Sequence, residues 1–179
     1  MTKTNANPGK GNGGNGKYNP YLPNPARIVS IKEEVSGQRP IKTFRTEFTG
    51  DREFTFRCGQ CAMVSVFGTG ESMISISSPA SGNGSGLHPD NQLQFSILKM
   101  GRVTSALHDM EVGDEIGIRG PYGNNFPIEE WQGRNLIFIG GGIGLAPLWS
   151  VLHTALANPG LYGNLMLIYG ARTSNDLVY

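Results

Sequence analysis

Residues 136–147 have the sequence Leu-Ile-Phe-Ile-Gly-Gly-Gly-Ile-Gly-Leu-Ala-Pro, which contains the strongest fold signal in the chain. The first four residues form a continuous apolar run, as in a parallel strand that is covered on both faces. The glycines lead into a helix-like stretch over residues 146–157, and Pro147 suits its first turn because the missing N–H costs nothing there. A second apolar run follows at residues 165–169. This order predicts a β-loop-α-β unit with parallel strands.

The glycine cluster at residues 140–144 is also a candidate binding site. Glycine lets the backbone approach a diphosphate closely, and the N-terminus of the following helix offers N–H donors and a partial positive charge. The spacing departs from the strict G-x-G-x-x-G pattern, and no acidic residue follows at the usual distance. A purely structural strand-to-helix turn is therefore the alternative interpretation.

Upstream of residue 131 the sequence favours a second kind of architecture. Short segments alternate apolar and polar residues, and Gly, Pro, Asn and Asp separate them. The predicted strands are residues 26–34, 42–48, 61–66, 73–77, 93–99 and 115–119, with one helix at residues 104–110. This pattern predicts an antiparallel sandwich or barrel. Residues 1–18 are rich in Gly, Asn and Lys, so we predict a disordered tail there.

Residues 100–107 form a second candidate site, at the start of the predicted helix. Gly101 permits an unusual backbone angle, and Thr104 or Ser105 is a candidate helix cap. Hydroxyls and free N–H groups that face one point form an anion cradle. A plain helix cap explains the same residues equally well.

Residues 70–79 form a third candidate site, on a predicted strand. Ser75 and Ser77 alternate with Ile74 and Ile76, which predicts one hydroxyl-lined face and one apolar face. Such a strand suits a planar heterocycle, although a strand with one solvated face is the more common explanation.

Composition narrows the function classes. The 15 Lys and Arg residues nearly balance the 14 Asp and Glu residues, which argues against nucleic-acid binding. There is no apolar stretch long enough to span a membrane and no signal-peptide core, so we expect a cytoplasmic protein. Cys58 and Cys61 form a C-x-x-C pair that is either redox-active, metal-binding or buried, and we predict buried thiols. The histidines share no metal-ligand spacing, so no metal site is predicted.

Taken together and in this order, the three candidate sites resemble the ferredoxin–NADP⁺ reductase superfamily. The more specific resemblance is to the gamma (diaphorase) subunits of NAD(P)-linked hydrogenases and sulfhydrogenases, and the electron-transfer subunit of dihydroorotate dehydrogenase is similar. The resemblance rests on residues 19–23 (NPYLP), 43–45 (TFR), 66–68 (VFG) with 70–71 (GE), 74–78 (ISISS), 101–104 (GRVT), 106–108 (ALH), 113–114 (GD), 119–124 (RGPYGN), 126–127 (FP), 140–147 (GGGIGLAP) and 169–172 (YGAR).

The resemblance implies an FAD-binding, antiparallel Greek-key β-barrel followed by a truncated, Rossmann-like α/β domain for a nicotinamide coenzyme. The implied domains are a tail at residues 1–18, the barrel at 19–130 and the start of the NAD(P)-binding domain at 131–179. By analogy, the residues that contact FAD are Ile74, Ser75, Ile76, Ser77, Lys99, Gly101, Val103, Thr104 and Ser105. The implied coenzyme residues are Gly140, Gly141, Gly142, Ile143, Gly144, Pro147 and Arg172.

The implied chemistry is hydride transfer between NAD(P)H and FAD, with electrons passing on to iron–sulfur subunits of a hydrogenase-type complex. No catalytic acid or base is implied, and the choice between NAD and NADP stays open. The other functional hypotheses are a non-catalytic docking or structural subunit and a fragment that keeps the barrel fold.

Three departures from the family pattern bear on this interpretation. The flavin strand has Ser72 and Ile74 where the superfamily has arginine and tyrosine, and Leu98 stands where a basic residue is common, which leaves Lys99 or Arg102 to supply positive charge. Gamma subunits also carry a carboxy-terminal cysteine cluster for [2Fe–2S]. This sequence has no cysteine after Cys61, so that cluster cannot form in it.

Overall fold

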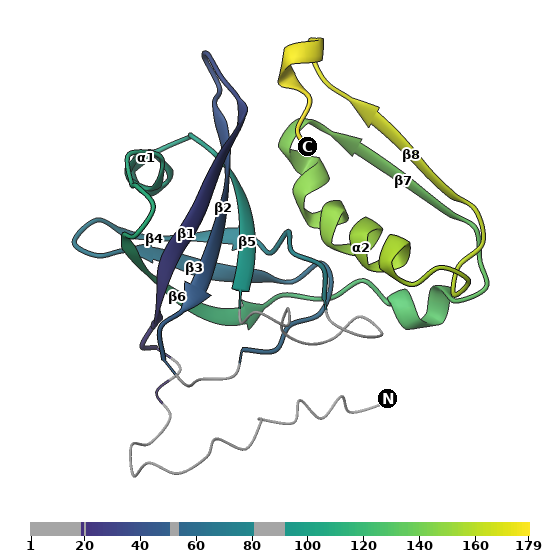
Figure 1. Ribbon diagram of the computed structural model, residues 1–179, viewed down its shortest axis with the longest axis horizontal. Coiled ribbons are helices and arrows are strands. Elements are labelled where there is room, and N and C mark those ends of the chain that lie inside the picture. Colours follow the sequence, from purple (N-terminus) through teal and green to yellow (C-terminus); the bar gives the residue numbers. More distant parts are fainter. Residues whose placement is uncertain (1–18, 20, 51–53, 81–91) are drawn as a thin grey trace.

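The computed structural model describes residues 19, 21–50, 54–80 and 92–179, and the predicted tail at residues 1–18 lies outside this part of the chain (Figure 1). Six strands form one antiparallel sheet in the order β4-β3-β6-β1-β2-β5. They are β1 (Asn24–Val35), β2 (Ile41–Phe48), β3 (Cys61–Val66), β4 (Gly70–Ser75), β5 (Gln92–Leu98) and β6 (Glu115–Tyr122). Each predicted strand is present, with ends that differ by one to three residues where they differ at all.

The predicted antiparallel architecture is confirmed, but the strands do not close into a continuous barrel. β4 and β5 are the two edges of the sheet, and one isolated bridge between Ile76 and Phe95 links the chain after β4 to β5. The β3–β4 hairpin pairs Val66 with Gly70, so β4 begins earlier than predicted and ends at Ser75. Too little strand then remains for a longer ladder with β5.

The core of the six-stranded sheet follows from the alternation of its strands. Successive side chains of a strand point to opposite faces, so one set of apolar residues gathers on the inner face. Ile28, Phe44 and Phe95 are buried there with at most 2% of their surface exposed. Burying each such side chain stabilises the fold by roughly 1.5–3 kcal/mol. Helix α1 (Arg102–His108) packs against β3 and β4 and buries Leu107.

The remaining elements form a β7–α2–β8 unit. They are η1 (Ile128–Trp131), β7 (Leu136–Gly141), η2 (Gly142–Gly144), α2 (Leu145–Ala157), β8 (Leu165–Gly170) and η3 (Ser174–Asp176). β7 and β8 are parallel, with Leu136 opposite Leu165. The predicted β-loop-α-β unit is therefore confirmed, and Pro147 lies in the first turn of α2 as expected.

Helix α2 lies between the two sheets (Figure 1). Its Thr154 hydroxyl donates to the Ser150 carbonyl at 2.8 Å and accepts the Ala80 N–H at 3.2 Å. The Cys58 sulfur lies 3.2 Å from the same hydroxyl. Cys58 is fully buried as a free thiol, as predicted, whereas Cys61 is a free thiol that is only partly buried.

The face of the β7–β8 pair that points away from α2 is apolar and exposed. Ile137 and Ile139 have 62% and 71% of their surface accessible, and Met166 and Ile168 are exposed beside them. Phe138, which points to the other face, is buried. Among the described residues, no helix has the length and apolarity needed to cross a membrane.

Candidate functional site

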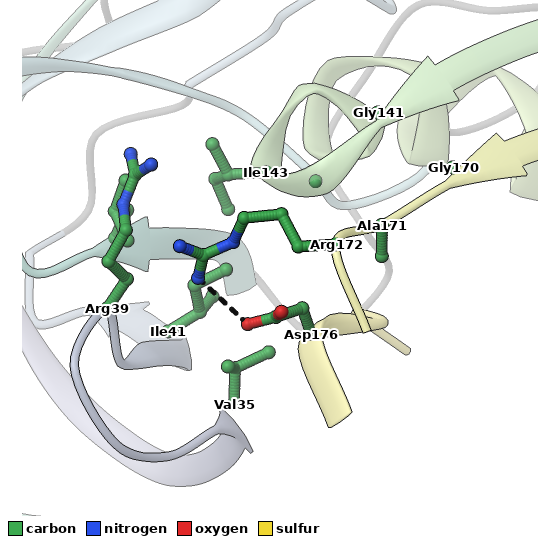
Figure 2. Close-up of a pocket in the computed structure, with 11 residues that line it drawn as sticks. Val35, Arg39, Ile41, Gly141, Ile143, Gly170, Ala171, Arg172 and Asp176 are labelled. Carbon is green, nitrogen blue, oxygen red and sulfur yellow. Dashed lines mark hydrogen bonds and ion pairs between the residues drawn. The ribbon is translucent and has the colours of Figure 1, made fainter. Parts of the chain in front are cut away.

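A cavity of about 430 Å³ opens between the six-stranded sheet and the β7–α2–β8 unit (Figure 2). The sheet contributes the end of β1, the β1–β2 turn, the start of β2 and the end of β5. The β7–α2–β8 unit contributes the end of β7, the start of η2, the turn after β8 and η3. The lining residues are Val35, Arg39, Ile41, Leu98, Gly141, Gly142, Ile143, Gly170, Ala171, Arg172 and Asp176.

The glycine segment places bare backbone against this cavity. β7 ends at Gly141, and Gly142 has a φ of +50°, which favours glycine. A Cβ at Gly142 would meet no atom within 4 Å, so the backbone there borders open space. The Tyr169 hydroxyl donates to the Gly142 carbonyl at 3.0 Å and fixes the loop. η2 has no side-chain cap, and the Leu145 N–H at the start of α2 donates to the Gly142 carbonyl, so the backbone that borders the cavity is that of Gly141, Gly142 and Ile143.

Of the seven predicted coenzyme residues, Gly141, Gly142, Ile143 and Arg172 line the cavity. The other three, Gly140, Gly144 and Pro147, belong to the same strand-loop-helix segment but do not line it. A Cβ at Gly140 would lie 3.3 Å from the Leu145 side chain, so this glycine serves the packing of β7 on α2.

Arg172 extends across the cavity from the turn after β8 (Figure 2). Its Nη2 donates to Asp176 Oδ1 at 3.0 Å, and the Thr173 hydroxyl donates to Asp176 Oδ2 at 3.0 Å. The Thr173 hydrogen bond and the Arg172 guanidinium together lower the pKa of the Asp176 carboxyl. Asp176 therefore stays ionised and orients Arg172.

The residues predicted for the second site surround the N-terminus of α1. Gly101, with a φ of +109°, is the residue before the helix, and a Cβ there would meet nothing within 4 Å. The prediction that Thr104 or Ser105 caps the helix is wrong, because α1 begins at Arg102 and has no side-chain cap. The Thr104 hydroxyl instead accepts the Met100 N–H at 2.8 Å and donates to the Gly101 carbonyl at 3.2 Å. Lys99 forms an ion pair with Asp109 at 3.1 Å.

The serine strand lies beside α1. A Cβ at Gly70, where β4 begins, would lie 3.5 Å from Val103, so the first residues of β4 and α1 are neighbours. Ile74 and Ser75 are partly buried at the other end of β4. The prediction that Ser77 continues an open, hydroxyl-lined strand face is wrong, because β4 ends at Ser75. Ser77 is fully buried, and its hydroxyl donates to the Gln94 carbonyl at 3.1 Å. Neither this strand nor residues 101–105 line the cavity of Figure 2.

Two aromatic residues that the sequence did not single out as site residues join the two halves of the molecule near these serines. The Tyr179 ring stacks on Trp149 of α2, with centroids 4.0 Å apart, and its hydroxyl lies 2.6 Å from the Ser96 hydroxyl of β5. Burial raises the pKa of the Tyr179 phenol to about 12, although hydrogen bonds with Ser96 and Ser77 oppose the shift. Among the described residues, no cluster of three or more His, Cys, Asp or Glu side chains has the arrangement of a metal site.

Comparison with protein families assigns both halves of this architecture. Residues 26–126, more than half of the chain, match the oxidoreductase FAD-binding domain, and residues 138–179 match the oxidoreductase NAD-binding domain. The chain belongs to the oxidoreductase FAD-binding domain family. The six-stranded sheet with α1 is thus the FAD-binding domain, and the β7–α2–β8 unit is the NAD-binding domain.

Individual relatives agree with this assignment. The sulfhydrogenase 2 subunit gamma of Pyrococcus furiosus is 41% identical over 90% of this chain and 53% of its own length. A probable dihydroorotate dehydrogenase B (NAD(+)) electron transfer subunit of Methanocaldococcus jannaschii is 33% identical over 85% of this chain and 50% of its own length. The chain therefore spans about half the length of the curated relatives it matches.

Solved structures match the fold. The ferredoxin–NADP⁺ reductase of Plasmodium falciparum superposes with a TM-score of 0.72 at 21% identity, over 88% of this chain and 62% of the reductase. At that identity the likeness shows that the FAD-binding and NAD-binding domains follow each other in the same architecture.

The geometry of both domains suits their dinucleotides. In the FAD-binding domain, the backbone at Gly101 borders open space next to β4. In the NAD-binding domain, Gly142 borders the cavity, and the Arg172 guanidinium lies across from it. Bare backbone next to a cation is the arrangement that binds a diphosphate.

Proposed function

We propose that this chain is part of an electron-transfer flavoprotein that oxidises NAD(P)H and passes electrons to an iron–sulfur partner. The observation that carries the proposal is a cavity that both domains line: Gly141 and Gly142 of the NAD-binding domain border it together with Ile41 and Leu98 of the FAD-binding domain. A coenzyme bound at the glycines is thereby directed towards the flavin-binding sheet. Bound FAD would accept hydride from the nicotinamide and release electrons singly.

The chain's own residues bind and orient the two dinucleotides in this proposal. Ser75 offers a hydroxyl to the edge of the flavin ring, and Ile74 packs against the ring. Gly101, Val103 and Ser105 contact the FAD diphosphate. Ile76, Ser77 and Thr104 are buried or nearly so, and we infer that they act by holding the backbone of the site.

Partners and location are part of the same proposal. Relatives that are named as subunits of sulfhydrogenase and of dihydroorotate dehydrogenase B support assembly with further redox subunits. We infer a hydrogenase-type iron–sulfur complex in the cytoplasm.

A titration of the purified protein with FAD, followed by anaerobic addition of NADH or NADPH, tests the function. We expect flavin fluorescence to be quenched on binding and the blue absorbance band of the flavin to bleach on reduction. Gly142→Ala should slow the bleaching at unchanged FAD affinity, because alanine at a φ of +50° strains the glycine loop. Gly160→Ala is the matched control, since Gly160 has a φ of +91°, an open Cβ position and no place in the cavity.

The second candidate function is a non-catalytic docking subunit. One observation favours it: Tyr179 covers the Ser96 hydroxyl beside the proposed flavin strand. A protein that stays colourless and takes up no added FAD would support the docking function and end the electron-transfer proposal.

A further inference from the structure

Two guanidinium groups enter the cavity of Figure 2 from opposite domains. Arg172 belongs to the NAD-binding domain and is bound to Asp176. Arg39 belongs to the β1–β2 turn of the FAD-binding domain, and its side chain is exposed. Arg39 forms no hydrogen bond or ion pair with any other residue that the structure describes. Its charge is therefore available to a ligand.

The β1–β2 turn holds Arg39 in place. Val35 and Ile41 pair across the hairpin and are both buried, so only residues 36–40 form the turn. Gly37 has a φ of +86°, which allows the tight reversal. Pro40 restricts the backbone of the residue before it to extended angles. Arg39 is thus presented from a short and well-anchored turn.

The charges of the cavity indicate what it binds. Arg39 and Arg172 contribute two positive charges against the single negative charge of Asp176. Lys99, which the sequence offered as a compensating cation for Leu98, is bound to Asp109 and does not line the cavity; nor does Arg102. The backbone of Gly142 and Ile143, at the start of η2, borders the cavity in the same domain as Arg172. A doubly charged anion between two guanidinium groups fits this arrangement.

We propose that Arg39 is a coenzyme-binding residue that the FAD-binding domain supplies to the NAD-binding domain. With Arg172 it binds the diphosphate of the nicotinamide dinucleotide in front of Gly141 and Gly142. This inference rests on the proposed function, because it assumes that the coenzyme occupies the glycine loop. Its consequence is that the coenzyme joins the two domains when it binds.

Calorimetric titration of the purified protein with ADP, 2′-AMP, NADH and adenosine tests the proposal. Arg39→Gln should weaken binding of ADP and NADH about tenfold or more, the range expected for losing hydrogen bonds to a charged group. Adenosine, which has no phosphate, should bind equally to both proteins. Arg39→Lys should recover part of the affinity, because lysine keeps the charge but not the planar fork. Added salt should weaken ADP binding less in Arg39→Gln than in the unchanged protein.

Arg27→Gln is the matched control. Arg27 lies on β1 of the same domain, is more than half exposed and does not line the cavity, so this variant removes the same charge elsewhere. Equal ADP affinity in Arg39→Gln and Arg27→Gln would overturn the inference while leaving the proposed function intact. A loss confined to 2′-AMP would overturn the diphosphate assignment. If the unchanged protein bound neither ADP nor NADH, the proposed function itself would fall.

Discussion

The two sheets of this molecule differ in how they are covered. The six-stranded sheet curls around its own core, in which Phe44 and Phe95 pair across β2 and β5 and are almost fully buried. The β7–β8 sheet is packed on one face only: Phe138 points towards α2, whereas Ile137 and Ile139 are exposed on the other face. Parallel sheets are normally covered on both faces. This difference indicates that the FAD-binding domain has a core of its own, whereas the NAD-binding domain is stabilised by the packing of α2 against the FAD-binding domain.

Truncation of a core residue in the FAD-binding domain should have the largest effect. Phe95→Ala removes a ring with no exposed surface and should lower the free energy of unfolding by about 3–5 kcal/mol, from lost burial and the cavity left behind. Urea unfolding followed by circular dichroism measures this value. The control Ile139→Thr, on the exposed face, should change it by less than about 0.5 kcal/mol. A large loss in Ile139→Thr would mean that the exposed face is covered in solution.

The contact between the domains should have the next largest effect. Thr154→Val keeps the shape of the side chain but removes the acceptor of the buried Ala80 N–H, which should cost about 1–3 kcal/mol. Thr154→Ser keeps the hydroxyl and should lose less. The same urea titrations compare the two variants. Equal stability of Thr154→Val and the unchanged protein would show that α2 contributes nothing polar to the domain contact.

The pH dependence of the free energy of unfolding should be a smaller effect, with one contribution from a histidine in each domain. Burial lowers the pKa of His108, next to β5, and of His153, on α2, below the usual 6.5. The unfolded chain therefore binds more protons in mild acid, and the free energy of unfolding falls as the pH drops below about 6.5. His108→Gln should reduce this slope, and the double variant with His153→Gln should reduce it further. The measurement is urea unfolding at several pH values, and an unchanged slope in the double variant would contradict the expectation.

Much of the fold could be predicted because alternation and glycine position are local signals. Strand β3 has the ends that its alternation predicts, and the β7-loop-α2 order follows from residues 136–147 alone. β4 begins three residues earlier than predicted, because the tight hairpin that follows Val66 sets its register through Gly70. α1 likewise begins at Arg102, because Thr104 bonds back to Met100 instead of capping.

The candidate site was less predictable because it combines distant segments. Gly141, Gly142 and Arg172 carry motif signals and line the cavity. Arg39 lies in a polar turn with no motif, and only the packing of that hairpin beside Ile143 brings it to the glycine loop. Tyr179 meets Ser96 across 83 residues of sequence, a distance over which no periodicity carries information.

The buried position of Cys58 has a consequence for following the molecule in solution. Its sulfur is enclosed by the Ser150 carbonyl and the Thr154 hydroxyl of α2, whereas the neighbouring Cys61 is partly accessible. A bulky thiol reagent will therefore modify the two cysteines at different rates. The modification rate of Cys58 therefore reports how often α2 separates from the FAD-binding domain, and it can be measured without adding a label site to the chain.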